Sequence, residues 1–278
     1  MGRIAVIVHV YYRELWKELA DCIANFPEDD TDVFVTIVSD DDCFKAEILS
    51  RFPRADIRVV ENRGYDVAPF LSVLRTVDLS KYEYVAKLHT KRDDACWVNY
   101  LPFVKSAWRK RLLSFCSSRR AIEKTIRFMA SHSDVGMVSH PSIIVGRGDF
   151  QESEVVKVRA EEIVRKLGLA PRGRQFVAGT MFICRADCLR PLQGCSVEEF
   201  ECSAGDASMT GDYHTPGLAH VYERVFGYLT RAEGYRIADV RGLLPLYDAT
   251  YWIRVPVFYA SRLLFRCTLK PLLSLIKR

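Results

Sequence analysis

The early part of the chain alternates between continuous apolar runs and segments with apolar residues at helical spacing. Residues 4–10 form a continuous apolar run, which is typical of a strand buried on both faces of a parallel sheet. Residues 13–26 then carry apolar residues at helical spacing. The same succession repeats and predicts the strands 33–38, 57–60 and 84–88 and the helices 44–52 and 70–77. A β-α-β-α order of this kind predicts a parallel sheet with crossover helices.

The middle of the chain is predicted to be mainly helical. Apolar stripes on polar helices predict the helices 98–116, 119–132, 155–167 and 218–228. Two further strands are expected, 135–138 and 176–184, the second with a kink at Gly179. Because no repeat or low-complexity linker divides these segments, we expect one α/β domain over residues 1–248.

The segment 249–278 has a different composition. It is rich in aromatic and aliphatic residues, and no acidic residue follows Asp248. Its basic residues are Arg254, Arg262, Arg266, Lys270, Lys277 and Arg278. A basic stripe beside an apolar face predicts an amphipathic helix that lies on an anionic membrane surface, interrupted at Pro256 and Pro271. The alternative is a terminal helix packed on the domain with a solvated basic face.

Composition restricts the class of protein. The 278 residues are 49% hydrophobic and 27% charged, as in a folded globular protein. The net charge of +5 is modest and is spread along the chain, so we expect no nucleic-acid partner. Nine cysteines occur without a C-x-x-C pair, which favours reduced, buried thiols over a zinc site. With no visible secretory signal and no apolar run of about 20 residues, the expected location is cytoplasmic, peripheral at the inner face of the cell membrane.

Polar side chains follow each of the first four predicted strands, where ligands bind in open parallel sheets. They are His9, Ser39, the segment Asn62-Arg63-Gly64-Tyr65-Asp66 and the segment His89-Thr90-Lys91-Arg92. The last segment combines cations with hydrogen-bond donors, which suits a diphosphate. Gly64 allows the backbone to approach a ligand, and Asp66 stands where a helix N-cap belongs. The alternatives are a plain turn with a cap, and a solvated basic loop.

Two later segments carry further candidates. Gly179 and Thr180 are small residues inside an apolar strand, where they admit a substrate close to the backbone or, alternatively, form a bulge. Asp212 lies in a loop rich in Gly, Ser and Asp, and Glu223 lies three residues after His220 on the following helix. Either carboxylate could act as a general base. The alternative for Glu223 is an ordinary surface pair with an arginine.

Five segments, taken in order, resemble the rhamnan synthesis protein F family. They are Val8-His9-Val10-Tyr11-Tyr12, the segment from Asn62 to Leu71, the segment from Tyr84 to Lys91, Ala178-Gly179-Thr180-Met181-Phe182 and the segment from Leu218 to Arg224. The resemblance covers roughly residues 3 to 245. It implies a glycosyltransferase with a single Rossmann-like domain of the A-type fold, a nucleotide-diphosphate sugar donor, often an activated rhamnose, and a lipid-linked glycan acceptor in polysaccharide or O-antigen synthesis.

The chain departs from what the resemblance implies at two places. A-type transferases usually hold a divalent metal with Asp-x-Asp, where this chain has His89-Thr90-Lys91. We therefore expect no obligatory metal, and a divalent cofactor, Mn²⁺ or Mg²⁺, is the alternative. The family often carries an acidic residue and a glycine where this chain has Thr215-Pro216-Gly217.

These observations predict an inverting glycosyltransferase with Asp212 as the first candidate for the base and Glu223 as the second. The expected donor-binding residues are His9, Ser39, Asn62, Arg63, Gly64, Asp66, His89, Lys91, Gly179 and Thr180. Because the acidic residue before residue 218 is missing, a second hypothesis stays open. In it the chain is a non-catalytic module that binds a sugar nucleotide or a glycan and scaffolds a polysaccharide assembly complex.

Overall fold

The computed structural model describes residues 2–92, 107–146, 154–200 and 217–250, and single positions 253, 257, 260, 264 and 267. Its strands are β1 (Ile4–Val10), β2 (Thr31–Ile37), β3 (Asp56–Val59), β4 (Tyr84–His89), β5 (Val135–Val138), β6 (Ile144–Val145), β7 (Phe176–Val177), β8 (Phe182–Arg185) and β9 (Arg236–Ala238). Its α-helices are α1 (Trp16–Ile23), α2 (Asp42–Arg51), α3 (Val67–Leu74), α4 (Ala107–Leu112), α5 (Arg119–Ser131), α6 (Glu154–Lys166), α7 (Leu218–Ala232) and α8 (Leu244–Ala249). Short 3-10 helices are η1 (Arg13–Leu15), η2 (Glu28–Asp30), η3 (Leu79–Lys81), η5 (Pro141–Ile143) and η6 (Ala186–Gly194).

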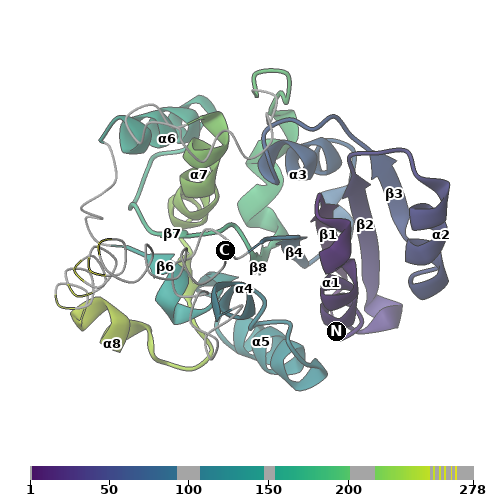
Figure 1. The fold of residues 1–278 in the computed structure, drawn as a ribbon. Helices are drawn as coiled ribbons and strands as arrows, with labels where there is room; N and C mark the ends of the chain where they lie inside the picture. The colour runs from purple at the N-terminus through teal and green to yellow at the C-terminus, as the bar shows by residue number, and fades with distance from the viewer. Residues whose placement is uncertain are drawn as a thin grey trace.

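The central sheet has seven strands in the order β3-β2-β1-β4-β8-β5-β9, and β6 and β7 form a separate two-stranded sheet (Figure 1). The strands β1, β2, β3 and β4 are mutually parallel, and β9 is parallel to β5. Only β8 runs antiparallel to its neighbours β4 and β5. The predicted α/β class with a mostly parallel central sheet is confirmed.

The strand order reverses between β1 and β4. The chain runs outward from β1 to β2 and β3, and then returns to place β4 on the other side of β1. Since crossover connections are right-handed, α1 and α2 cover one face of the sheet and α3 covers the other. Such a reversal opens a crevice at the carboxyl ends of the two strands, which is where open α/β sheets bind ligands. His9 and His89 are register partners at these ends.

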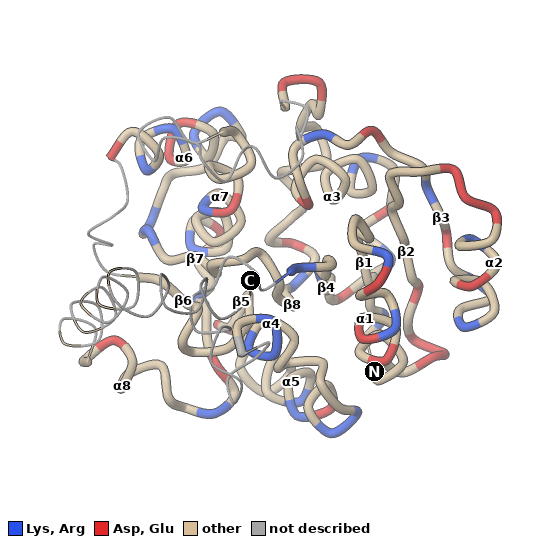
Figure 2. The backbone as a smooth tube through the Cα atoms, viewed as in Figure 1, with Lys and Arg blue, Asp and Glu red and all other residues tan. Residues whose placement is uncertain are grey.

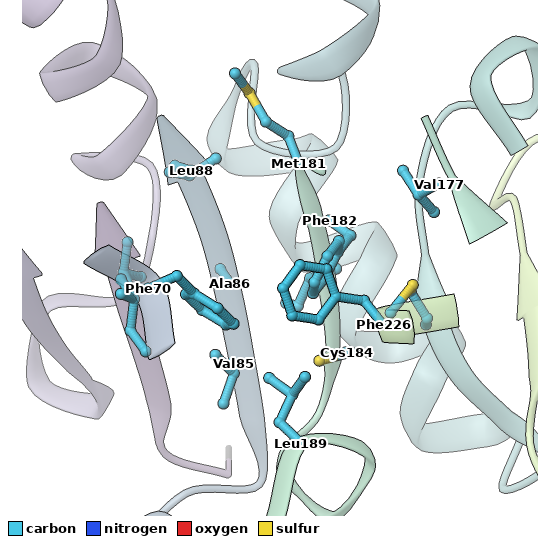
Figure 3. Packing of buried hydrophobic residues seen from close by; sticks show 14 of the residues in the cluster. Phe70, Val85, Ala86, Leu88, Val177, Met181, Phe182, Cys184, Leu189 and Phe226 are labelled. Atoms are coloured by element: carbon cyan, nitrogen blue, oxygen red, sulfur yellow. The ribbon is translucent and has the colours of Figure 1, made fainter. Parts of the chain in front are cut away.

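Aromatic side chains join α3 and α7 to the sheet beneath them (Figure 3). The ring of Phe226 on α7 lies 5.5 Å from the ring of Phe70 on α3 and 5.7 Å from the ring of Phe182 on β8, measured between centroids. All three side chains are almost fully buried. Truncating a buried phenylalanine of this kind costs about 3–5 kcal/mol, so this cluster fixes α7 against the middle of the sheet.

Two sequence-based predictions were wrong in detail. The expected single strand 176–184 is divided into β7 and β8, which belong to different sheets. The cause is a turn in which Gly179 and Thr180 have φ angles of +81° and +53°, outside the β region. The expected helix 98–116 ends at Leu112 in α4, and its part before residue 107 lies outside the described residues.

The other predicted elements agree with the structure to within a few residues, whereas β6, β9 and α8 were not predicted. The described cysteines are free, and those that are buried are Cys22, Cys116, Cys184, Cys188 and Cys195. Among the helices described, none combines the length and the apolar composition that crossing a bilayer requires.

Candidate functional site

A buried ion pair lies at the centre of the predicted site. The Nζ atom of Lys87, inside β4, donates a hydrogen bond to Oδ2 of Asp66, at the start of α3. The hydroxyl of Thr180, in the turn before β8, donates to the same carboxylate oxygen and accepts from Lys87 Nζ at 3.1 Å. The Lys87 side chain is 1% exposed, whereas that of Asp66 is 16% exposed. Asp66 is therefore the more exposed member of this ion pair.

Two left-handed turns place Asp66 and Thr180. Gly64 and Tyr65 have φ angles of +62° and +54°, and Gly179 and Thr180 form the second left-handed pair. A Cβ atom on Gly64 would lie 2.6 Å from the Phe200 ring, so this position requires glycine for its contacts as well as its backbone. Positive φ at the β-branched Thr180 is rare and costs of order 1–3 kcal/mol. Strained backbone of this kind gathers at functional sites.

The predicted N-cap role of Asp66 was wrong in one respect. Asp66 does occupy the N-cap position of α3, but its side chain makes no capping hydrogen bond. The carboxylate turns instead toward Lys87 and Thr180. The ion pair therefore takes the carboxylate that would otherwise satisfy the first turn of the helix.

Burial and neighbouring charges shift the pKa values of the ionisable groups in this site. Burial would raise the pKa of Asp66, but the positive charges around it outweigh that effect and lower its pKa. Burial lowers the pKa of His89 well below its usual range, so this imidazole is neutral at neutral pH. Burial also lowers the pKa of Lys87, and the charge of Asp66 opposes that shift. Of the charges that lower the pKa of Asp66, the Lys87 ammonium is the one hydrogen-bonded to the carboxylate, so these two groups offset each other.

His89 and His9 differ in their hydrogen bonding. His89 is 3% exposed, and neither of its ring nitrogens has a hydrogen-bond partner among the described residues. Its Nδ1 lies 3.6 Å from Asp66 Oδ2. The Nδ1 of His9 lies 2.9 Å from the hydroxyl of Thr36, which donates its own proton to Val8 O. His9 Nδ1 must therefore carry a proton, and its Nε2 is left as an acceptor.

The residues that follow His89 have separate roles. The Thr90 hydroxyl accepts from the backbone N–H groups of Tyr11 and Tyr12, at 3.0 and 2.9 Å, so it joins the loops after β1 and β4. Lys91 is half-buried, and its charge contributes to lowering the pKa of Asp66. Because Lys87 and Asp66 offset each other, Lys91 adds a positive charge beside this pair.

Three other predicted donor-binding residues lie outside the Asp66 group. The Arg63 guanidinium donates to the carbonyl oxygens of Phe200 and Glu198, at 2.9 and 3.1 Å, and so anchors the segment after η6. Asn62 is half-buried beside it. Ser39 is exposed after the end of β2, and no hydrogen bond joins it to Asp66 or His89 in the described part of the chain.

The two candidate bases fare differently. Glu223, on α7, accepts from the backbone N–H of Gly179 at 2.6 Å, and its other oxygen is paired with Arg224. Both oxygens are therefore engaged, and Glu223 acts on the turn that carries Thr180. Asp212 lies outside the described residues.

The donor set around Asp66 does not fit a hard divalent cation. Mg²⁺ and Mn²⁺ prefer several oxygen ligands, whereas this group offers one carboxylate, already paired with Lys87, and two histidines. Across the described segments, no group of three or more His, Cys, Asp or Glu side chains is placed to hold a metal ion.

Sequence reasoning missed Lys87 and Thr36. A signal for Lys87 was present, because it is the only charged residue in the apolar run Tyr84-Val85-Ala86-Lys87-Leu88. A lysine inside a buried strand requires a carboxylate partner. Thr36 gave no comparable signal, since threonine is common in strands.

Comparison with known proteins finds relatives of this chain. Two curated relatives, both described as uncharacterized protein WxcX from Xanthomonas campestris pv. campestris, strains B100 and ATCC 33913, are 25% identical over 249 residues, or 86% of this chain. The chain spans 33% of the length of these relatives.

Solved structures with a similar fold include residues 1–349 of TarS from S. aureus, with a TM-score of 0.43 and 12% identity, covering 85% of this chain and 57% of that one. Mannosyltransferase PcManGT from Pyrobaculum calidifontis, solved with GDP-Man and Mn²⁺, has a TM-score of 0.43 and 18% identity, covering 86% of this chain and 54% of that one. The family described as rhamnan synthesis protein F matches residues 1–235, and the chain therefore belongs to the rhamnan synthesis protein F family.

Proposed function

We propose that this chain is a glycosyltransferase that moves a sugar from a nucleotide-diphosphate donor to a lipid-linked glycan of a cell-surface polysaccharide. The observation that carries the proposal is His89. A buried imidazole with two unpartnered nitrogens, in the crevice where the strand order reverses, is a hydrogen-bonding group that awaits a ligand. Lys91 beside it supplies the positive charge that a diphosphate requires.

In the proposed reaction, His89 and Lys91 stabilise the negative charge that grows on the departing diphosphate. Such stabilisation acts mainly in the transition state, where it lowers the barrier. No hydrogen bond reaches Oδ1 of Asp66 from the described residues, so this oxygen can accept a sugar or ribose hydroxyl. A carboxylate takes the proton of the acceptor hydroxyl, and direct displacement inverts the anomeric carbon. We assign the base to Asp212, because both oxygens of Glu223 are engaged.

A thermal-shift panel of sugar nucleotides, each with and without Mn²⁺ or Mg²⁺, tests the proposal. A donor that binds only the folded protein raises the melting temperature as its concentration exceeds its Kd. The best donor is then incubated with a lipid-linked glycan, and release of nucleoside diphosphate is measured. If no sugar nucleotide stabilises the protein, the proposal is wrong.

Two observations favour a second function. Both carboxylate oxygens of Glu223 are engaged, and the chain has Thr215-Pro216-Gly217 where the family often carries an acidic residue. In this alternative, the chain binds a sugar nucleotide or glycan and scaffolds an assembly complex without turnover. Donor binding without release of nucleoside diphosphate, in the presence of acceptor, would identify it.

We also propose that segment 249–278 contacts the inner face of the cell membrane. Ile253, Val257, Ala260 and Leu264 are helical and exposed. Their spacing of i, i+4, i+7 and i+11 places them on one apolar face. The basic residues predicted to flank this face lie outside the described residues.

Truncation after Asp248 is expected to move the protein from membrane to soluble fractions with the domain still folded. A truncated protein that still sediments with vesicles would refute the assignment.

A further inference from the structure

A cavity opens at the carboxyl ends of β5 and β9, on the other half of the sheet from β1. Its volume is about 290 Å³, and Val138, Ser139 and Asp239 at the strand ends form part of its wall. Because β5 is parallel to β4 through the antiparallel β8, this cavity opens at the same edge of the sheet as His89. Ligand pockets usually measure about 300–1,000 Å³, so this one suits a small polar group and is too small for a whole nucleotide sugar.

The cavity is lined by basic side chains from two parts of the chain. Arg120 and Lys124 come from α5, and Arg241 follows β9. No ion pair joins any of them to a carboxylate among the described residues. Figure 2 shows the concentration of basic positions on α4 and α5. These cations can therefore neutralise an incoming anion.

The start of α5 adds to this positive charge. Ser118 caps the helix by accepting from the backbone N–H of Ala121, and no acidic residue stands in the first turn. A helix N-terminus is itself positive and usually attracts Asp or Glu. Here it carries Arg119 and Arg120 instead, a combination that an anionic ligand would stabilise.

The carboxylate of Asp239, which lines the cavity, already accepts hydrogen bonds from the backbone. Both oxygens of Asp239 accept backbone hydrogen bonds, from Arg241 at 2.9 Å, Leu243 at 3.0 Å and Leu244 at 2.7 Å. The neighbouring His140 adds no charge to the cavity at neutral pH, because burial and then the charges of Arg241 and Arg111 lower its pKa to about 4. The cavity is therefore positive despite Asp239.

One contact ties the cavity to the Asp66 group. The hydroxyl of Ser139 donates to the backbone oxygen of Met181 at 3.1 Å. Met181 directly follows Thr180, whose hydroxyl binds Asp66. A ligand in the cavity thus lies across β8 from the proposed donor site.

We propose that this cavity binds the diphosphate of the lipid-linked acceptor. The inference rests on the proposed glycosyl transfer, and it assigns the two diphosphates of that reaction to separate places. The donor diphosphate binds at the ends of β1 and β4, and the acceptor diphosphate binds at the ends of β5 and β9.

Isothermal titration calorimetry on the full chain tests this assignment. The probes are farnesyl diphosphate as a short lipid diphosphate, inorganic pyrophosphate as the free anion, and the nucleoside diphosphate of the best donor. The first two are titrated with that nucleoside diphosphate already saturating. The variants are Arg120→Gln with Lys124→Gln, and Arg241→Gln alone. Arg127→Gln is the matched control, since Arg127 lies on the same helix outside the cavity and, among the described residues, binds the Glu123 carbonyl oxygen alone.

We expect the double variant to raise the Kd for farnesyl diphosphate about tenfold or more. Arg241→Gln should also raise this Kd. Arg127→Gln should leave all affinities unchanged, and the nucleoside diphosphate should bind every variant equally. Unchanged farnesyl diphosphate affinity would overturn the assignment, as would binding of pyrophosphate alone. If the variants lost affinity for the nucleoside diphosphate to the same extent, the cavity would belong to the donor site. Failure of the proposed function is a separate result, namely that wild-type protein binds no sugar nucleotide.

Discussion

Asp66 and Thr180 stand 114 residues apart in the sequence, yet the hydroxyl of Thr180 donates to Oδ2 of Asp66. Lys87 lies between them and binds both. The contact joins the first half of the sheet, with its parallel strands, to the antiparallel strand β8 and the helices behind it. The function proposed for the chain depends on this junction, because it places the Asp66 carboxylate beside His89 and Lys91.

Removing the Lys87 ammonium should destabilise the fold. In Lys87→Met, the carboxylate of Asp66 is left without the charge that balances it, and breaking such a pair costs about 3–5 kcal/mol. The double variant Asp66→Asn with Lys87→Met removes both charges and should recover much of that loss. Urea unfolding of the wild type, both single variants and the double variant measures the coupling.

A strictly additive double variant would contradict this account, because it would show that the two groups do not interact. The double variant also keeps the test valid if Lys87→Met alone does not fold.

Glu223 should behave as a positioning residue. Glu223→Gln retains an oxygen that can accept from the Gly179 N–H, whereas Glu223→Ala does not. We expect Gln to preserve turnover within about tenfold, and Ala to lower turnover and weaken the fold by about 1–3 kcal/mol. A general base would give another result, since loss of its proton-accepting carboxylate costs about 10²–10⁴-fold in kcat even with Gln in its place. Steady-state kinetics of the two variants, with thermal unfolding of each, separates the two roles.

Stability should fall in mild acid. Burial lowers the pKa of His9 from 6.5 to about 4. Between these two values the unfolded chain binds more protons than the folded chain, so the free energy of unfolding decreases as pH is lowered through this window. Above about pH 6.5 this contribution is fully present. In His9→Asn, the slope of unfolding free energy against pH should be smaller, because the proton that His9 takes up on unfolding is no longer bound. Equal slopes in urea unfolding between pH 4.5 and 7 would show that His9 is not held neutral.

The sequence predicted the sheet more fully than the site. Strands such as 4–10 and 135–138 are short apolar runs, and that pattern was sufficient to place them. His9, Asp66, His89 and Thr180 were also identified, because strand ends and glycine turns are visible in a sequence. What could not be predicted is the direction of each side chain. Arg63 turns to backbone carbonyls and Asp66 turns away from its helix, and both orientations depend on contacts more than 20 residues away.

The turn at Gly179 shows a second limit. An apolar run with an internal glycine fits a kinked strand as well as two strands in different sheets. Only the packing of Phe182 against Phe226, and of β7 against β6, decides between them. Pairing between distant strands is a tertiary property, so local pattern could not resolve it.

The affinity of the donor's nucleoside diphosphate for Lys91→Gln tests the central claim most directly. Lys81→Gln is the matched control, since Lys81 is an exposed lysine at the opposite end of β4. If the donor diphosphate binds beside His89, calorimetry should show Kd raised about tenfold or more in Lys91→Gln and unchanged in Lys81→Gln. Equal affinity of both variants and the wild type would contradict the account.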